Sequence, residues 1–343
     1  MKTNQNSVNG LNKILFVNFS KFALGLTLCV GLTLTSCRKD DNSPSPDGAA
    51  LTEFFETNRS ESLQSFTLNA TTGGTITGSE GTKVVFQPNS IGLNGNPVTG
   101  NVTIQLIELY DKSGMLTLNM PTTGIKPNGD HEVLKSGGEF FLNAVQGSNQ
   151  LELLIPAEIQ SRGVNPAEFE NFQVFRAGDD INATDLWVEA DEDGDGENDD
   201  AQARDGQGTA TGGPAMYNVF NTSAFGWTNL DRWYNYAGTT TQLYVDVPEG
   251  FDGDNCSVYL TYDGEPTALA RMDIYDEDEE LFTEHYGRIP VGQAVHFILV
   301  AEIDGVLHYT IQAASIAIDH VEVMAAPQPT TQAQLEVLID ALP

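Results

Sequence analysis

Short alternating runs of apolar and polar residues begin near residue 51 and are separated by Gly, Asn, Pro and Asp. This pattern is typical of antiparallel β structure, because successive side chains of a strand point to opposite faces. In the run 102–109, one face carries Val102, Ile104 and Leu106. Further strands are predicted at residues 83–87, 139–145 and 151–155. The pattern therefore predicts an N-terminal β-sandwich over residues 51–160.

A second group of strand-like runs lies in residues 241–343. The clearest are residues 242–247, 257–262, 294–301, 307–311 and 315–318. The segment Glu302–Gly305 fits a hairpin turn between two of these runs. Strands at this spacing predict an immunoglobulin-like sandwich.

A short helix is predicted after the prolines at positions 327 and 329. Thr331 and Gln334 have the spacing of a capping box, in which each side chain satisfies a backbone N–H at the start of the helix. Four apolar residues then share one helix face, which we expect to dock on the body: Leu335, Leu338, Ile339 and Leu342.

The predicted fold class is all-β, with two β-sandwich domains and this C-terminal helix. Between the sandwiches, residues 161–240 contain fewer strand-like runs and carry the two most unusual local sequences. The chain has 343 residues and is 40% hydrophobic. It is therefore long and apolar enough to form two cores.

The first 36 residues have the pattern of a lipoprotein signal peptide. Lysines and no acidic residue precede the apolar run Phe22–Leu32, which is too short to span a bilayer. The run ends in Leu34–Cys37, which resembles the lipobox cleaved by the lipoprotein signal peptidase. The resemblance implies a mature chain that begins at a lipid-modified Cys37. Several acyl chains, at about 0.8 kcal/mol per buried methylene, would anchor it permanently. The alternatives are an ordinary secretory peptide or a short membrane anchor.

The residues that follow the lipobox bear on location. Arg38–Asp41 resembles the lysine-plus-two-acidic export signal of surface lipoproteins in Bacteroidota, and a solvated charged tether is the alternative. Residues 42–50 are rich in Ser, Pro, Asp and Gly, so we expect residues 37–50 to form a flexible tether. The expected location is the outer membrane, lipid-anchored and exposed at the cell surface.

Charge and cysteine content narrow the classes of partner. The chain has 16 Lys and Arg against 48 Asp and Glu, a formal net charge of −32. Such a surface repels phosphate backbones, which argues against nucleic-acid binding, and attracts divalent cations.

The cysteines predict no disulfide within the mature chain. Once Cys29 is removed with the signal and Cys37 is lipidated, Cys256 is the one cysteine left, so it is predicted to be a packed core residue.

The stretch 73–156 resembles the β-sandwich module shared by zonula occludens proteins, ankyrins and netrin receptors. The resemblance is carried by Phe86–Ile91, Gly100–Leu106 and Ser136–Phe140, although Asn89 stands where the family has a glycine. It implies a fold and a role in interactions, and no activity.

The sharpest motif is an acidic loop, in which Asp191, Asp193 and Asp195 alternate before a glycine. Carboxylates at positions one, three and five of a turned loop can wrap a calcium ion, which needs six to eight oxygen ligands. Glu197 and Asp199 complete the candidate set. Position twelve of the loop is Gln202, which cannot supply the bidentate carboxylate of an EF-hand, and the flanking segments are predicted to be strand and loop rather than helices. The loop is therefore more similar to the acidic calcium-binding repeats of thrombospondins. The alternative is a solvated hairpin tip.

A second candidate site lies in residues 224–234, where aromatic and polar side chains alternate closely. Aromatic faces beside hydrogen-bonding groups could stack on a sugar ring. The alternative is that the aromatic residues belong to the core of the β protein and that the acidic residue and its arginine neighbour satisfy each other or the backbone. A similar run recurs in uncharacterised Bacteroidota lipoproteins. The candidate ligand-binding residues are Trp227, Asn229, Asp231, Arg232 and Trp233.

No catalytic residue is assigned from the sequence. The five histidines lack metalloprotease spacing, and there is no nucleophile elbow or phosphate loop. We expect a non-enzymatic binding or structural module, stabilised by calcium, whose partners are the membrane and either a glycan or an envelope protein. The alternatives are a carbohydrate-active hydrolase with two carboxylates that the sequence does not locate, and a scaffold for a secretion or uptake complex.

Overall fold

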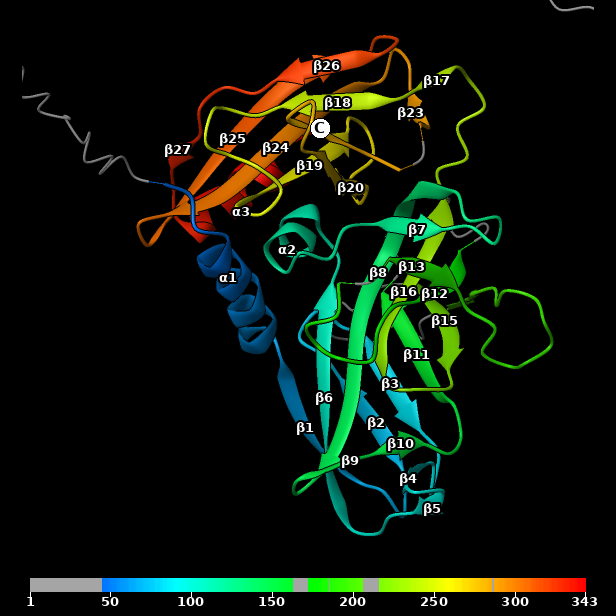
Figure 1. The fold of residues 1–343 in the computed structure, drawn as a ribbon. Coiled ribbons are helices and arrows are strands. Elements are labelled where there is room, and N and C mark those ends of the chain that lie inside the picture. The colour runs from blue at the N-terminus through cyan, green and yellow to red at the C-terminus, as the bar shows by residue number, and fades with distance from the viewer. Residues whose placement is uncertain (1–44, 163–171, 185, 206–215, 286) are drawn as a thin grey trace, which may run out of the picture. The chain divides into compact units, whose positions relative to one another are not determined.

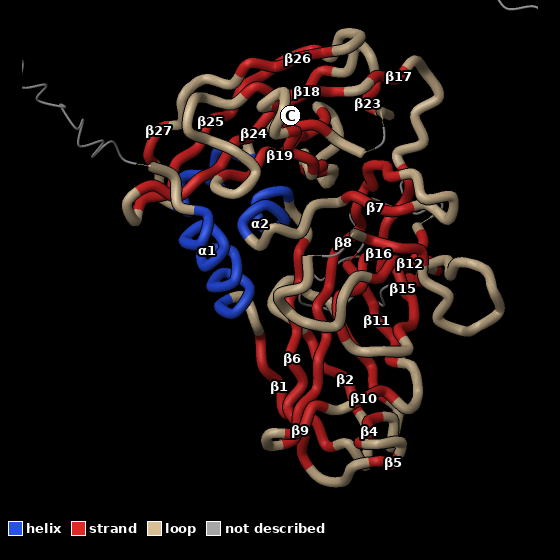
Figure 2. Tube along the Cα trace, viewed as in Figure 1, coloured by secondary structure: helices blue, strands red, loops and turns tan. Residues whose placement is uncertain are grey.

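The computed structural model describes residues 45–162, 172–184, 186–205, 216–285 and 287–343. Within these ranges the chain is all-β, as predicted, with three helices and several sheets (Figures 1 and 2). The helices are α1 (Gly48–Glu61), α2 (Lys112–Thr117) and α3 (Gln332–Asp340). Cys37 and the rest of the expected signal and lipidation segment lie outside the described residues.

The N-terminal sandwich is built from two large sheets. The first has the order β1 (Gln64–Asn69), β6 (Asn101–Leu109), β8 (His131–Gln146), β16 (Gly226–Trp233), β12 (Gln173–Arg176), β13 (Trp187–Glu189) and β7 (Thr123–Ile125), with β9 (Asn149–Gln150) paired to β8. The second has the order β14 (Gln202–Asp205), β15 (Met216–Thr222), β11 (Ala157–Arg162), β3 (Lys83–Phe86) and β2 (Gly74–Thr77). A small sheet joins β10 (Glu152–Leu153), β4 (Ile91–Leu93) and β5 (Asn96–Pro97).

The C-terminal sandwich has two facing sheets. One has the order β20 (Leu269–Arg271), β19 (Cys256–Tyr262), β24 (Ala294–Ile303), β25 (Val306–Ser315) and β27 (Gln328–Pro329). The other has the order β21 (Ile274–Asp276), β22 (Leu281–Thr283), β18 (Leu243–Asp246) and β26 (His320–Val323). A separate two-stranded sheet pairs β17 (Thr240–Thr241) with β23 (Ile289–Pro290). Cys256 is buried in the core of this sandwich, as expected.

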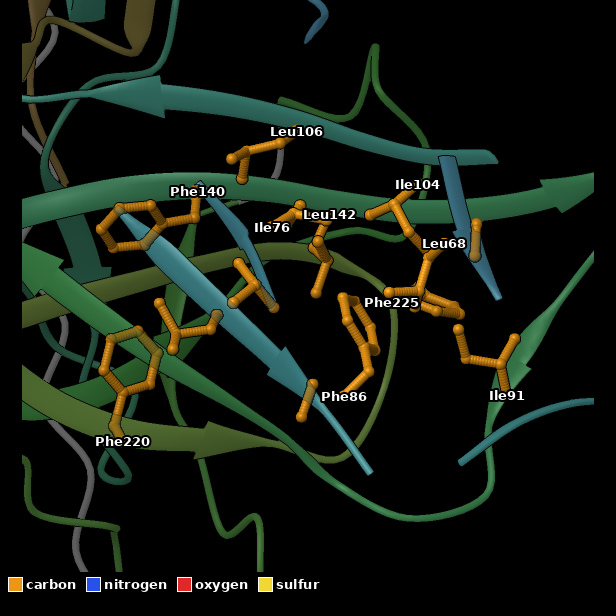
Figure 3. Packing of buried hydrophobic residues seen from close by; sticks show 14 of the residues in the cluster. Leu68, Ile76, Phe86, Ile91, Ile104, Leu106, Phe140, Leu142, Phe220 and Phe225 are labelled. Carbon is orange, nitrogen blue, oxygen red and sulfur yellow. The ribbon is translucent and has the colours of Figure 1, made fainter. Parts of the chain in front are cut away.

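The inner faces of the two large N-terminal sheets form one apolar core (Figure 3). Leu68, Ile104 and Phe140 from the first sheet meet Phe86 and Phe220 from the second. The alternation predicted for residues 102–106 is confirmed, because Val102, Ile104 and Leu106 all belong to this core. Burial of such side chains, at about 25 cal/mol per Å², is what holds the sheets together.

A further core, here called the junction core, covers the opposite face of the same first sheet. Ile107 and Leu109 of β6 point into it, together with residues from all three helices and from the C-terminal sandwich. The helices contribute Leu51, Phe55, Met115, Leu116, Leu335 and Ile339. Strands β6 and β8 are therefore buried on both faces where the helices cover them and on one face beyond the helices.

The structure corrects three expectations. Residues 48–61 form helix α1 instead of tether and strand, because Asp47 caps the backbone N–H groups of Ala49 and Ala50 and the apolar residues repeat with helical period. Residues 161–240 are not a separate segment, since β12 to β16 complete the N-terminal sandwich. On α3, whose capping box is confirmed, Leu335 and Ile339 are buried but Leu338 is 38% exposed.

Candidate functional site

The aromatic and polar residues of β16 are interior residues. Trp227, Asn229 and Asp231 are each 0% exposed, and Arg232 and Trp233 are partly buried. Trp227 packs against Phe141 with the ring centroids 5.3 Å apart. A side chain without exposed surface cannot contact a sugar, so burial contradicts the predicted ligand site at Trp227, Asn229 and Asp231. For Arg232 and Trp233 it stays a prediction. The alternative, that the aromatic residues belong to the core, holds for Trp227.

The polar side chains of β16 form a buried network with β8. Ser136 Oγ donates to Asn229 Oδ1 at 2.9 Å, and Asn229 Nδ2 donates to Asp231 Oδ2 at 2.6 Å. The same amide lies 3.4 Å from Glu139 Oε1. The pairing of the two strands shifts by one residue here, because Asn229 is opposite Glu139 and Asp231 is opposite Ser136, so β8 carries one extra residue between Ser136 and Glu139. Gly138 permits this local geometry, since its φ is +132° and a Cβ there would meet the rings of Phe140 and Tyr110.

Burial dominates the electrostatics of this network. Loss of water raises the pKa of Glu139 well above its usual value, and the nearby Asp231 raises it further. Burial likewise raises the pKa of Asp231 well above its usual value. One oxygen of each carboxyl group has no hydrogen-bond partner. Burial therefore favours the protonated form of both groups, and because neither side chain is exposed to a substrate this pair is structural.

A large hollow lies on the outer face of the first sheet, next to α1. Its volume is about 890 Å³. The sheet supplies Gln105, Phe141 and Asn143, where the helical cover ends, and α1 supplies Glu56 and Ser60. The remaining lining residues are Leu63, between α1 and β1, and three segments of loop or short strand: Gln150–Leu153, Asp179–Asn182 and Ser223–Phe225.

Three amide side chains line the floor of the hollow. Asn143 Nδ2 donates to Gln105 Oε1 at 2.8 Å, and Gln150 donates to Asn143 Oδ1. Gln105 and Asn143 are opposite each other on β6 and β8 and are both half-buried. Each amide has further donor and acceptor capacity for a ligand. The lining also includes the carboxylates of Glu56, Glu152, Asp179 and Asp180, and no basic residue.

One wall of the hollow is fastened by Arg176 of β12. Its guanidinium donates to Phe225 O at 2.8 Å and to Ala224 O at 3.0 Å, and it lies 3.4 Å from Glu192 Oε1. Glu192 in turn accepts a hydrogen bond from the backbone N–H of Ser223. Glu192 belongs to the acidic loop, and Arg176 contacts both Glu192 and the Ala224–Phe225 wall. The ion pair between Arg176 and Glu192 therefore connects the acidic loop to the wall of the hollow.

The acidic loop gathers three of the five predicted ligands. The carboxylates of Asp191, Asp193 and Asp195 are exposed and lie within 4.8 Å of one another, while Glu197 and Asp199 are outside this group. Asp191 accepts hydrogen bonds from the backbone N–H groups of Gly194, Asp195 and Gly196. These bonds curl the loop so that its carboxylates converge.

Two observations near the end of the loop concern its remaining oxygen atoms. Partial burial raises the pKa of Asp199, and the charges of Asp193, Glu192 and Asp191 raise it further. The buried amide oxygen and nitrogen of Asn198 have no hydrogen-bond partner. Carboxylates that converge in a turned loop are ligands that a hard divalent cation prefers. The geometry is therefore compatible with calcium.

Together, the fold and these features place the protein in the class of all-β sandwich proteins with a solvent-open polar hollow. No family model and no curated protein sequence matches the chain. Among the described residues, no helix has the length and apolar character needed to cross a membrane.

Sequence reasoning missed the hollow, although part of its signal was present. The alternation along residues 102–106 placed Gln105 on the solvated face. The sequence did not predict the two elements that wall the hollow. Helix α1 closes one side, and the loop 179–182 closes another and is held by a hydrogen bond from Trp227 Nε1 to Ile181 O at 3.2 Å.

The protonated pair predicts a specific dependence of stability on pH. Since the pKa values of Glu139 and Asp231 are raised in the folded state, the native protein retains protons that the unfolded chain releases, and stability falls as pH rises above the unfolded values near 4. The variant Glu139→Gln should lose less stability between pH 5 and pH 8, as measured by urea denaturation. Glu249→Gln, at an exposed turn, should follow the wild type. Equal pH dependence in all three proteins would show that Glu139 is ionised in the folded state.

Calcium is expected to stabilise the protein through the acidic loop. At about a hundredfold excess over Kd, a ligand specific for the folded state adds about 2.7 kcal/mol. We therefore expect a higher melting temperature in calcium than in EDTA, and no such rise for the double variant Asp193→Asn/Asp195→Asn. The matched control is Asp276→Asn/Asp278→Asn in another exposed acidic turn, where Asp276 also accepts backbone hydrogen bonds. A calcium response that the loop variant retains would assign the ion to a different place.

Proposed function

We propose that the chain is a lipid-anchored, cell-surface binding module that takes a neutral glycan in the hollow beside α1. The observation that carries the proposal is a row of amides on the floor of a hollow of about 890 Å³, formed by the half-buried Gln105 and Asn143 and the exposed Gln150. That volume is in the range of ligand sites in proteins.

The chemistry of the lining favours a polyhydroxylated ligand. Amide groups donate and accept together, as sugar hydroxyls do, so one amide can pair with two neighbouring hydroxyls. Leu63, Leu153 and Ile181 are partly exposed in the lining and add apolar surface, against which the C–H face of a sugar ring can pack. Four carboxylates and no basic residue in the lining disfavour an anionic ligand.

Calcium at the acidic loop supports this binding indirectly in our proposal. The ion pair between Arg176 and Glu192 ties the loop to the Ser223–Phe225 wall. An ion held by Asp191, Asp193 and Asp195 would restrict that loop and with it the wall. Preorganised walls reduce the entropy lost when a ligand binds.

Hydrolysis is the second candidate function, favoured by the carboxylates of Glu56, Glu152, Asp179 and Asp180 around the same hollow. A glycosidase needs two carboxyl groups about 5 to 10 Å apart on either side of the scissile bond. The buried pair Glu139 and Asp231 cannot serve, because both are 0% exposed. Any hydrolytic pair would have to come from the rim of the hollow.

The proposal is tested by titrating neutral oligosaccharides into the full chain by calorimetry. We expect saturable binding that weakens more than about tenfold in Gln105→Ala/Asn143→Ala, the loss of about 1.4 kcal/mol or more of hydrogen bonding. The control Gln328→Ala removes an exposed amide outside the hollow and should bind like the wild type. Unchanged binding in the double variant would remove the hollow from consideration. Release of reducing ends during incubation would instead establish the hydrolase.

The anchor is tested separately by fractionation of cells that express the full chain. Lipidation at Cys37 places the protein in the membrane fraction, and protease added to intact cells should degrade it if it faces outward. Cys37→Ser removes the acceptor thiol, so the protein should move to the soluble fraction. Cys256→Ser, at a buried thiol, is the matched control. Membrane association that persists without Cys37 would point to a different anchor.

A further inference from the structure

Three side chains from distant parts of the chain meet at one end of β8. His131 is the first residue of β8, Asp273 lies between β20 and β21, and His285 follows β22. One potential ligand atom from each lies within 4.8 Å of the other two. The cluster therefore joins the first sheet of the N-terminal sandwich to the C-terminal sandwich, and it is separate from both the hollow and the acidic loop.

The carboxylate of Asp273 lies between the two imidazole rings. Its Oδ2 atom is 2.8 Å from His285 Nδ1 and 3.9 Å from His131 Nδ1, and the ring centroids are 4.9 Å apart. His131 Nδ1 is buried and has no hydrogen-bond partner. A buried ring nitrogen without a partner is costly, and a metal ion at this position would satisfy it.

Two imidazoles and one carboxylate form a donor set for a first-row divalent ion. Zinc takes histidine nitrogen and carboxylate oxygen at about 2.0 to 2.2 Å, and sites with three protein ligands keep one position open. Calcium and magnesium prefer oxygen ligands only, which separates this cluster from the acidic loop.

The exposure of the three residues allows an ion to enter. The side chain of His131 is 15% exposed, that of Asp273 20% and that of His285 50%. Tetrahedral coordination needs ligand atoms about 3.3 Å apart, so the cluster has to contract slightly. His285 is the most exposed of the three and belongs to no strand, so it is the ligand best able to move.

We infer that His131, Asp273 and His285 form a binding site for zinc or a similar transition-metal ion that cross-links the two sandwiches. Polar contacts already cross between the sandwiches near this point, since Arg288 pairs with Asp130 and Lys135 pairs with Glu265. A metal would add a bond network that holds β8 to the loops at residues 273 and 285. The site extends the protein's chemistry beyond glycan binding and does not depend on it.

The experiment is a calorimetric titration of zinc into the purified full chain, followed by cobalt substitution. We expect one zinc per chain, a rise in melting temperature, and visible absorption bands of cobalt with nitrogen and oxygen ligands. His285→Asn and Asp273→Asn should each weaken zinc binding more than about tenfold, while His308→Asn, outside the cluster, should have no effect. His285 is half exposed, so its substitution should leave the metal-free melting temperature close to that of the wild type.

Two further measurements decide the assignment. Asp193→Asn/Asp195→Asn should bind zinc as the wild type does, because the acidic loop is a separate site. Zinc binding lost in that variant but retained in His285→Asn would overturn the inference and place the ion at the loop. No zinc uptake by the wild type would also overturn it, leaving Asp273 as a hydrogen-bond partner of His285 alone.

Discussion

The structure depends on how the outer face of the first N-terminal sheet is covered. Ile107, Leu109, Phe141 and Trp227 make this face apolar at one end, and an exposed patch of that size costs free energy in water. Helices α1, α2 and α3 and the C-terminal sandwich bury it in the junction core. The cover stops before Gln105 and Asn143, and the hollow lies where it stops. The same packing brings the loops of the C-terminal sandwich to the start of β8.

Buried polar groups add a second constraint to this sheet. Ser136, Glu139, Asn229 and Asp231 lie between apolar neighbours of β8 and β16 and satisfy one another only in part. Apolar residues of similar volume would be more stable in general, so such a network lowers stability. Its geometry requires the extra residue that β8 carries between Ser136 and Glu139, because that offset brings Asn229 opposite Glu139 and Asp231 opposite Ser136. We interpret the network as a feature that fixes the register of two long central strands.

Our proposals place cations at two sites of different ligand chemistry. The acidic loop offers oxygen atoms in an exposed turn, a donor set for hard ions. The cluster at His131 offers two nitrogens and one carboxylate at the junction of the sandwiches, a donor set for zinc-like ions. The first would act on a wall of the hollow through Glu192 and Arg176, and the second on the connection between the sandwiches. The two sites are therefore distinguished by ligand chemistry and by what they stabilise.

The sequence by itself determined the fold class, the inward face of residues 102–106, the C-terminal helix with its capping box, and the convergence of Asp191, Asp193 and Asp195. These are local properties, since period, capping and loop spacing act over a few residues. The sequence did not predict that residues 48–61 form helix α1, because the few apolar residues there are compatible with the period of a strand as well as of a helix. It also did not show that Trp227, Asn229 and Asp231 are buried, or that His131, Asp273 and His285 meet. Those facts depend on which strands become neighbours and which faces the helices cover. Contacts between residues more than a hundred positions apart leave no periodic trace in one sequence, so only the tertiary structure decided them.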